Sequence, residues 1–221
     1  MSESHGRLRR LRFRNRRSVQ NMTAPHVIGR GDAISWAIAA SLKSVVHDID
    51  ESTRPTSDHV VIVVGVDPAL EPTPVGSLSA TEWRRFAEHP MRQALNALQR
   101  AYSSMRQKGG RIVLVLPSIG MTGAPCLVPY TTALEGIRAM AKSAARQWAS
   151  QNLIVNMIAA PLHLFAPRLS ASAGHVTAAA LQDDDALIES IVETTRFLLK
   201  RDVTGLVGET VIVDGGAMML P

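Results

Sequence analysis

Cysteine, aromatic residues and long apolar runs are all scarce in this chain of 221 residues. The lone cysteine, Cys126, excludes an intrachain disulfide, which fits a reducing compartment, so we expect a cytoplasmic protein. Apolar runs such as residues 60–66 have the length of a strand and are too short to cross a bilayer, so neither a transmembrane helix nor a signal peptide is expected. The seven histidines show no metal-ligand spacing, and no metal site is predicted.

Basic charge is abundant but confined to the N-terminus. The formal net charge is +5, whereas residues 1–21 alone carry +6 from seven arginines and Glu3, which leaves −1 for residues 22–221. We therefore expect an Arg-rich disordered tail over residues 1–21 and a single domain over residues 22–221. The tail has alternative interpretations, as a presequence, as sequence upstream of a true start at Met22, or as a contact with nucleic acid or membrane. A contact with nucleic acid is disfavoured, because Phe13 is the only aromatic residue of the tail on which a base could stack.

The order of the apolar segments alternates between strands and helices, as in a parallel α/β sheet. The β-branched run at residues 60–64 predicts a strand buried on both faces. Ser79 and Glu82 have the spacing of a capping box, which predicts the start of a helix. The other predicted strands are 26–28, 111–116, 154–159 and 210–213, and the other predicted helices are 34–42, 130–148 and a segment from about residue 184.

Several local motifs lie in the same order as in a known family. They are the strand at residues 111–113, the segment that begins with Tyr130, the pair Val155-Asn156 and the closing run at residues 208–216. With this order, residues 29–216 resemble the short-chain dehydrogenase/reductase family, whose members are NAD(P)-dependent enzymes with a Rossmann fold. The resemblance implies a Rossmann-like α/β fold built on a doubly wound parallel sheet.

The segment between the first predicted helix and the strand at residue 60 is short. It holds only 17 residues, 43–59, whereas one βαβ unit takes about 30 residues. We therefore predict a degenerate and truncated family member, whose sheet is shortened by loss of the second strand, the crossover helix and the third strand. In the family this region contacts the adenosine ribose, so half of the adenosine pocket is expected to be missing.

The catalytic positions implied by the resemblance are mostly substituted. Tyr130 matches the family's tyrosine, but Leu134 stands where the lysine of Tyr-x-x-x-Lys would lower the pKa of the phenol. Pro90 stands at the position of the family's asparagine and Pro117 at that of its serine, with Ser118 next along the chain as the candidate replacement. Tyr130 and Ser118 are therefore the predicted vestiges of a catalytic site.

The cofactor-binding positions implied by the resemblance are substituted too. The first loop keeps Gly29, but Ala33 and Ser35 replace the other glycines of Gly-x-x-x-Gly-x-Gly and place a Cβ where the pyrophosphate would lie. After the strand at residues 60–64, Gly65 alone remains of the family's Asn-Asn-Ala-Gly. Gly29 and Gly65 are the predicted vestiges of the cofactor site. No bound cofactor is expected, and NAD(P) is expected only if the chain is an active enzyme.

These losses favour a non-catalytic subunit over an enzyme. Our leading hypothesis is a family member that forms a hetero-oligomer with a catalytically intact relative, or that associates with itself. The complex would be a dehydrogenase or reductase, and by analogy its substrate would be an acyl thioester. In the family, subunits associate partly through the tyrosine helix, and small residues recur there: Ala133, Gly136, Ala139, Ala141, Ala144 and Ala145. One alternative is a divergent NAD(P)-dependent oxidoreductase that uses Tyr130 and Ser118. Another is a domain tethered to nucleic acid or membrane by residues 1–21.

Overall fold

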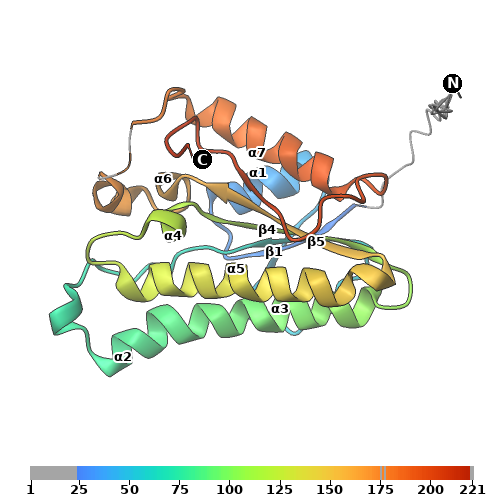
Figure 1. Cartoon of the computed structure of the whole chain (residues 1–221), viewed down its shortest axis with the longest axis horizontal. Coiled ribbons are helices and arrows are strands. Elements are labelled where there is room, and N and C mark those ends of the chain that lie inside the picture. Colours follow the sequence, from blue (N-terminus) through green and yellow to red (C-terminus); the bar gives the residue numbers. More distant parts are fainter. Residues whose placement is uncertain (1–23, 175, 177, 220–221) are drawn as a thin grey trace, which may run out of the picture.

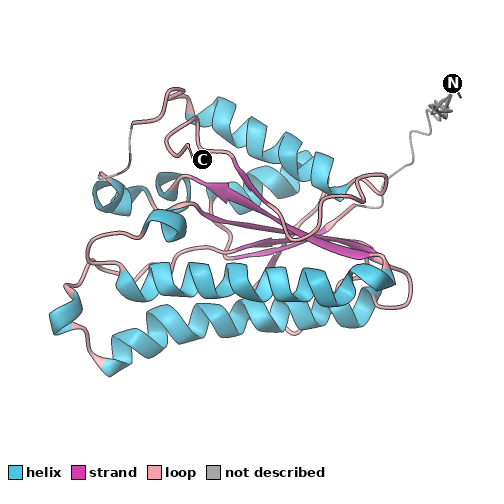
Figure 2. Ribbon diagram, in the orientation of Figure 1, coloured by secondary structure: helices cyan, strands magenta, loops and turns pink. Residues whose placement is uncertain are grey.

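A sheet forms the centre of the domain, with helices packed around it (Figure 2). It is parallel and has six strands, in the spatial order β2-β1-β3-β4-β5-β6. The computed structural model describes residues 24–174, 176 and 178–219, so the predicted tail at residues 1–21 lies outside the described part. The strands are β1 (His26–Gly29), β2 (Val46–Asp48), β3 (His59–Val63), β4 (Gly110–Pro117), β5 (Leu153–Ala160) and β6 (Thr210–Ile212). Strands β3, β4 and β5 are buried along their whole length because their apolar side chains meet helices on both faces.

Helices cover both faces of the sheet (Figure 1). On one face lie α3 (His89–Met105) and α5 (Val128–Trp148); on the other lie α1 (Ala33–Ser41), α6 (Leu162–Phe165) and α7 (Asp184–Leu199). Each face has its own apolar cluster, and the predicted doubly wound Rossmann-like sheet is confirmed. The short elements are η1 (Val75–Ser77), α4 (Ile119–Thr122), η3 (Ala149–Gln151) and η4 (Pro167–Ala173). No helix in the described part is both long and apolar enough to span a membrane.

The prediction that the second strand is lost is wrong. Residues Val46–Asp48 form β2, which pairs in parallel with β1 through the register Val27 to Val46 and Ile28 to His47. The chain then returns to β3 through residues 49–58, which contain no helix or strand. The truncation of the sheet is therefore confined to the crossover helix and the third strand, and three residues suffice for β2 because β1 supplies its hydrogen bonds.

The helix predicted from the capping box begins as expected. The Ser79 hydroxyl accepts a hydrogen bond from the N–H of Glu82, and the Glu82 carboxylate accepts one from the N–H of Ser79. Helix α2 (Ala80–Trp83) continues through a π-helical turn, η2 (Arg84–Glu88), into α3. The wide turn lies directly before Pro90, which lacks an N–H and clashes with the preceding turn of a regular helix. The helix thus accommodates Pro90 through a π turn.

The small residues of α5 serve mainly to pack this helix within the domain. A Cβ at half-buried Gly136 would lie 2.6 Å from the Sδ atom of Met91, so the glycine lets α3 approach α5 closely. Ala139 is exposed. The other members of the predicted stripe are buried inside the domain: Ala133, Ala141, Ala144 and Ala145. The surface that α5 offers to another subunit is therefore smaller than the sequence pattern indicated.

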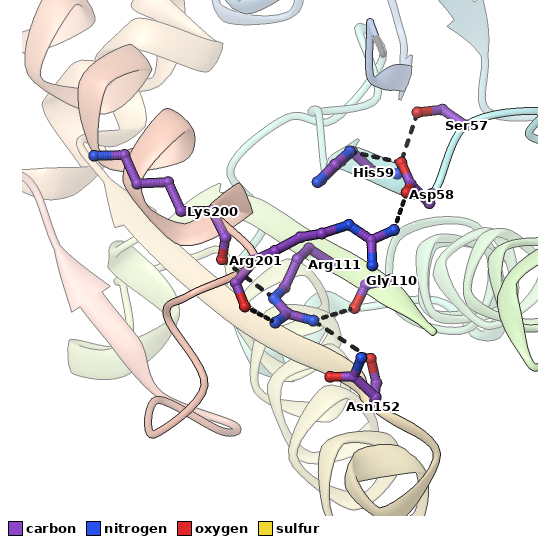
Figure 3. Close-up of polar contacts among 8 residues, drawn as sticks. All are labelled: Ser57, Asp58, His59, Gly110, Arg111, Asn152, Lys200 and Arg201. Atoms are coloured by element: carbon purple, nitrogen blue, oxygen red, sulfur yellow. Dashed lines mark hydrogen bonds and ion pairs between the residues drawn. The ribbon is translucent and has the colours of Figure 1, made fainter. Parts of the chain in front are cut away.

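At the amino-terminal edge of the sheet, the buried guanidinium of Arg111 joins three segments (Figure 3). Arg111 is 1% exposed, and burial lowers the pKa of its guanidinium, with Arg201 adding to the effect. Its partners are backbone carbonyls, at Gly110 (3.0 Å), Asn152 (3.3 Å), Lys200 (3.4 Å) and Arg201 (2.7 Å). Since the last two follow α7, Arg111 fixes the carboxyl end of that helix to β4 and to the start of β5.

His26 is a second buried ionisable residue, at the start of β1. Its ring stacks on that of His47 with centroids 3.9 Å apart. His26 is 7% exposed, and its Nε2 atom has no hydrogen-bond partner among the described residues. Burial, His47 and Arg100 lower the pKa of His26 to about 4. The folded protein therefore holds His26 neutral well below the pH at which a free histidine takes up a proton.

We expect the free energy of unfolding to fall as the pH drops from 7.5 to 5. Unfolded His26 takes up a proton near pH 6.5, whereas folded His26 does so only near pH 4, so the unfolded state binds more protons across this interval. The effect of this residue is about 2 kcal/mol at pH 5. Urea denaturation at pH 7.5 and pH 5 measures this effect. On acidification, the His26→Phe variant should lose about 2 kcal/mol less stability than the wild type. The control variant His89→Phe, changed at an exposed position, should lose as much as the wild type. Equal losses in His26→Phe and wild type would contradict the expectation.

Candidate functional site

Tyr130 lies in the first turn of α5 and points into the core. Its side chain is 1% exposed, and its hydroxyl donates a long hydrogen bond of 3.5 Å to the carbonyl of Gly65. Burial and the carboxylate of Asp32 raise the pKa of the phenol above its ordinary value, although Arg30 acts in the opposite direction. The phenol is therefore protonated at neutral pH, and its hydroxyl is kept from solvent.

Leu134, at the position of the family's lysine, is fully buried in the same apolar cluster as Tyr130. It packs so closely on α4 that a Cβ at Gly120 would lie 2.7 Å from the Leu134 Cβ. One turn further along α5, Arg138 is paired with Glu135 at 2.8 Å. The surroundings of Leu134 are therefore apolar and tightly packed.

Ser118 lies at the carboxyl end of β4, directly after Pro117. Its N–H donates to the carbonyl of Ala160 at 2.7 Å, and the residue is 7% exposed. Ser118 lines a cavity, whereas Tyr130 is not among the described residues that line it. The structure thus does not bring the two predicted catalytic residues together in one cavity.

The loop between β1 and α1, which binds the cofactor pyrophosphate in the resembling family, is filled by side chains of this chain. Oδ1 of Asp32 accepts hydrogen bonds from the N–H of Ser35 at 2.8 Å and from its hydroxyl at 2.6 Å, and so caps α1. The Ser35 side chain covers Gly29, where a Cβ would lie 2.5 Å from the Ser35 Oγ. A carboxylate therefore occupies the positive end of the helix, which is the place that attracts phosphate.

Gly65, the second predicted vestige of the cofactor site, is covered by the same loop. A Cβ at Gly65 would lie 2.9 Å from Oδ2 of Asp32 and 3.2 Å from Cδ of Arg30. The guanidinium of Arg30 donates to Oε1 of Gln93 at 2.8 Å, and the Gln93 amide donates to the Asp50 carboxylate at 2.7 Å. These contacts connect the first loop, α3 and the segment that stands in place of the crossover helix.

A cavity of about 560 Å³ lies beyond the carboxyl ends of β4, β5 and β6. Ser118, α6, the segment that follows α6, the first turn of α7 and the residues after β6 form its wall. On this wall, Nε2 of His163 lies 2.9 Å from Oδ1 of Asp184. Open α/β sheets bind ligands at this edge, so the cavity is the candidate binding site. No group of three or more His, Cys, Asp or Glu side chains in the described ranges is placed to hold a metal ion.

Sequence reasoning missed the residues that fill the first loop. Asp32 directly precedes an apolar helix, a position typical of a capping residue, so its role had a local signal. Gln93 and Asp50 have no such signal, because they lie 43 residues apart and meet only in the folded chain. The contact between His163 and Asp184 was not predicted for the same reason, since these residues are 21 positions apart.

Comparison with known proteins relates this fold to reductases. A family model described as Enoyl-(Acyl carrier protein) reductase matches residues 33–218. Similar curated proteins include 3-oxoacyl-[acyl-carrier-protein] reductase FabG of Staphylococcus aureus, 28% identical over 148 residues, and that of Staphylococcus epidermidis, 26% identical over 152 residues. Each of these matches covers 62% of this chain and 58% of the relative. An uncharacterized short-chain type dehydrogenase/reductase of Sinorhizobium fredii is 28% identical over 123 residues, covering 52% of this chain and 22% of that protein. The chain thus spans 58% of the length of the two reductases.

Proposed function

Because this chain belongs to the short-chain dehydrogenase/reductase family, a family of oxidoreductases, we propose that it is a non-catalytic subunit that associates with a catalytically intact relative. The observation that carries the proposal is the position of Tyr130. Its hydroxyl is enclosed in the core, in the same cluster as Leu134, and does not line the cavity. A general acid must come within hydrogen-bond reach of the group that it protonates, and among the described residues this phenol bonds only to the backbone carbonyl of Gly65.

The residues of the first loop do not fit a dinucleotide, which supports the proposal. A pyrophosphate at the start of α1 would meet the Asp32 carboxylate, and two like charges in a partly buried site repel each other. Arg30, the basic residue of this loop, is already bonded to Gln93. We therefore propose that the chain does not bind NAD(P) in the manner of the family.

The substrate class of the proposed complex follows from the relatives. The name 3-oxoacyl-[acyl-carrier-protein] reductase describes enzymes that act on an acyl group attached to a carrier protein. We propose that the intact partner acts on an acyl thioester and that this chain stabilises it or completes its assembly. The divergent-enzyme alternative has less support, because Ser118 lines the cavity and Tyr130 does not.

Titration with NADH and NADPH, with and without the partner, tests the proposal. We expect no change in nicotinamide fluorescence with the chain alone at millimolar cofactor, because Asp32 and Ser35 fill the phosphate position. Co-expression with an intact Tyr-x-x-x-Lys relative should give one complex by size-exclusion chromatography, and this complex should bind cofactor.

The intact relative expressed alone is the positive control for the fluorescence signal. Saturable binding of either nucleotide to the isolated chain would overturn the loss of the cofactor site. A stable homo-oligomer that excludes the relative during co-expression would overturn the proposed association.

A further inference from the structure

The amino-terminal edge of the sheet carries a group of exposed cationic side chains. All strands of the sheet are parallel, so their first residues lie at one edge, and α1, α3, α5 and α7 end there because each precedes a strand. Figure 1 shows α3, α5 and α7 ending at the same side of the domain. The exposed cations of these helix ends and of the turns after them are Lys43, Arg106, Lys108, Arg146 and Lys200. None of the five forms an ion pair with another described residue.

Few carboxylates at this edge offset the cations. Those in the segments that enter the strands are Asp58, Asp202 and Glu209. Asp58 is already paired with Arg201. At the opposite edge, three consecutive aspartates at residues 183–185 lie at the start of α7. The charge of the domain is therefore uneven, and its amino-terminal edge is the positive one.

Two large apolar side chains are exposed at the same edge. Val45, directly before β2, is 63% exposed, and Phe197, in the last turn of α7, is 44% exposed. Arg196 connects the two segments, because its guanidinium donates to the carbonyl of the last residue of α1 at 2.7 Å. Lys43 and Lys200 lie within three residues of Val45 and Phe197 respectively, so each apolar side chain has a cation close to it in the chain.

The basic residues 1–21 add charge at this edge. The described part begins at Ala24, two residues before β1. The carbonyl of Pro25 accepts a hydrogen bond of 2.5 Å from the hydroxyl of Ser44, next to Val45. Residues 1–21 carry a net charge of +6. Because residue 21 is three positions before Ala24, this charge joins the domain at the edge that holds the exposed cations.

We infer that the amino-terminal edge binds an anionic membrane surface, with Lys43 and Lys200 at the lipid headgroups and Val45 and Phe197 at the boundary of the acyl chains. Each cationic side chain near such a surface strengthens binding about fivefold, and apolar side chains add to it by entering the interface. A nucleic acid offers phosphates to the same cations but no apolar layer to Val45, so the combination favours a membrane. The contact involves neither a cofactor nor a partner subunit and is independent of the proposed function.

Co-sedimentation of the full chain with lipid vesicles tests the inference. The vesicles contain either phosphatidylcholine alone or an equal mixture of phosphatidylcholine and phosphatidylglycerol. At about 0.1 M salt, the chain should bind the mixed vesicles at least about tenfold more tightly than the neutral ones. A rise to about 1 M salt should remove most of this difference, because the screening length falls to about 3 Å. Equal binding to both kinds of vesicle at the lower salt, or no binding to either, would overturn the inference.

Charge reversals locate the contact on the domain. The double variant Lys43→Glu/Lys200→Glu should bind the mixed vesicles at least about tenfold more weakly than the wild type. Arg84→Glu/Arg92→Glu makes the same change of net charge at exposed positions near the start of α3, at the opposite edge. It should stay within about threefold of the wild type, because salt screens these more distant charges. Equal effects of the two double variants would show attraction by net charge alone and would contradict a contact at this edge.

Apolar substitutions separate a membrane from a nucleic acid. Val45→Ser/Phe197→Ser should weaken binding to the mixed vesicles about tenfold, whereas Leu95→Ser, at an exposed position of α3, should leave it unchanged. A single-stranded RNA is titrated with the same proteins, and circular dichroism verifies that each variant is folded. No effect of Val45→Ser/Phe197→Ser on vesicle binding would overturn the inference. RNA binding tighter than vesicle binding, and lost in Lys43→Glu/Lys200→Glu, would overturn it too and would assign the edge to nucleic acid.

Discussion

The Leu134→Lys variant, which restores the family's Tyr-x-x-x-Lys motif, is expected to unfold the domain instead of activating it. Leu134 is fully buried in the apolar cluster between the sheet, α3 and α5. Burial of an ammonium at such a site shifts its pKa by about 3–5 units, which corresponds to about 4–7 kcal/mol of lost stability. This loss is comparable to the whole free energy of unfolding of many domains, which is about 5–15 kcal/mol.

Urea denaturation of Leu134→Lys beside two controls measures this loss. Ala139→Lys introduces the same charge at an exposed position of α5 and should change the free energy of unfolding by less than about 0.5 kcal/mol. Leu134→Met keeps the site apolar and should cost less than about 1.5 kcal/mol. NADPH-dependent reduction of an acyl thioester should be undetectable in all three. A folded and active Leu134→Lys variant would contradict both the packing argument and the proposed loss of catalysis.

The central part of the fold was predictable because its signals are local. The β-branched run at residues 60–64 falls on β3, which is buried on both faces. The capping box at Ser79 and Glu82 starts α2, as its spacing indicated. Strand β2 was missed because three residues, Val46–Asp48, carry too little pattern, and only their pairing with β1 makes them a strand.

The candidate site was predictable in what it has lost, but not in what has replaced it. Each substituted position, such as Leu134 or Pro117, is visible as a residue that cannot do the chemistry of the family. The contact from Arg30 to Gln93 spans 63 residues, so no local pattern announces it. The cavity presents the same difficulty, since its wall comes from the ends of three strands and the segments that follow them. A lost catalytic or cofactor-binding residue can therefore be recognised from its position in the sequence. The contacts that fill the first loop and the wall of the cavity can be recognised only in the tertiary structure.

The Arg111→Met variant is expected to destabilise the domain by about 1–3 kcal/mol. The guanidinium donates to backbone carbonyls on β4, before β5 and after α7, and an apolar methionine offers no donor. A buried carbonyl left without a partner costs about 1–3 kcal/mol, and of the four residues that accept from Arg111 only Gly110 is buried. The carbonyls of Asn152 and Lys200 also keep a backbone donor, the N–H of Gly110 and of Val203 respectively. The carbonyls of Lys200 and Arg201 lose this donor together, so the carboxyl end of α7 should detach first.

Two measurements test the role of Arg111, the urea midpoint and amide hydrogen exchange at the end of α7. Arg92→Met makes the same replacement at an exposed position of α3 and should stay within about 0.5 kcal/mol of the wild type. The exchange rate of amides near Leu199 is compared with that of amides in β4. This ratio should be larger in Arg111→Met than in the wild type, because the lost hydrogen bonds hold the end of α7. The stability of Arg111→Lys should fall between those of Arg111→Met and the wild type, since one ammonium cannot reproduce the forked contacts of the guanidinium. A loss below about 1 kcal/mol in Arg111→Met would mean that water satisfies these carbonyls as well as the guanidinium does, and that α7 is held by its apolar face alone.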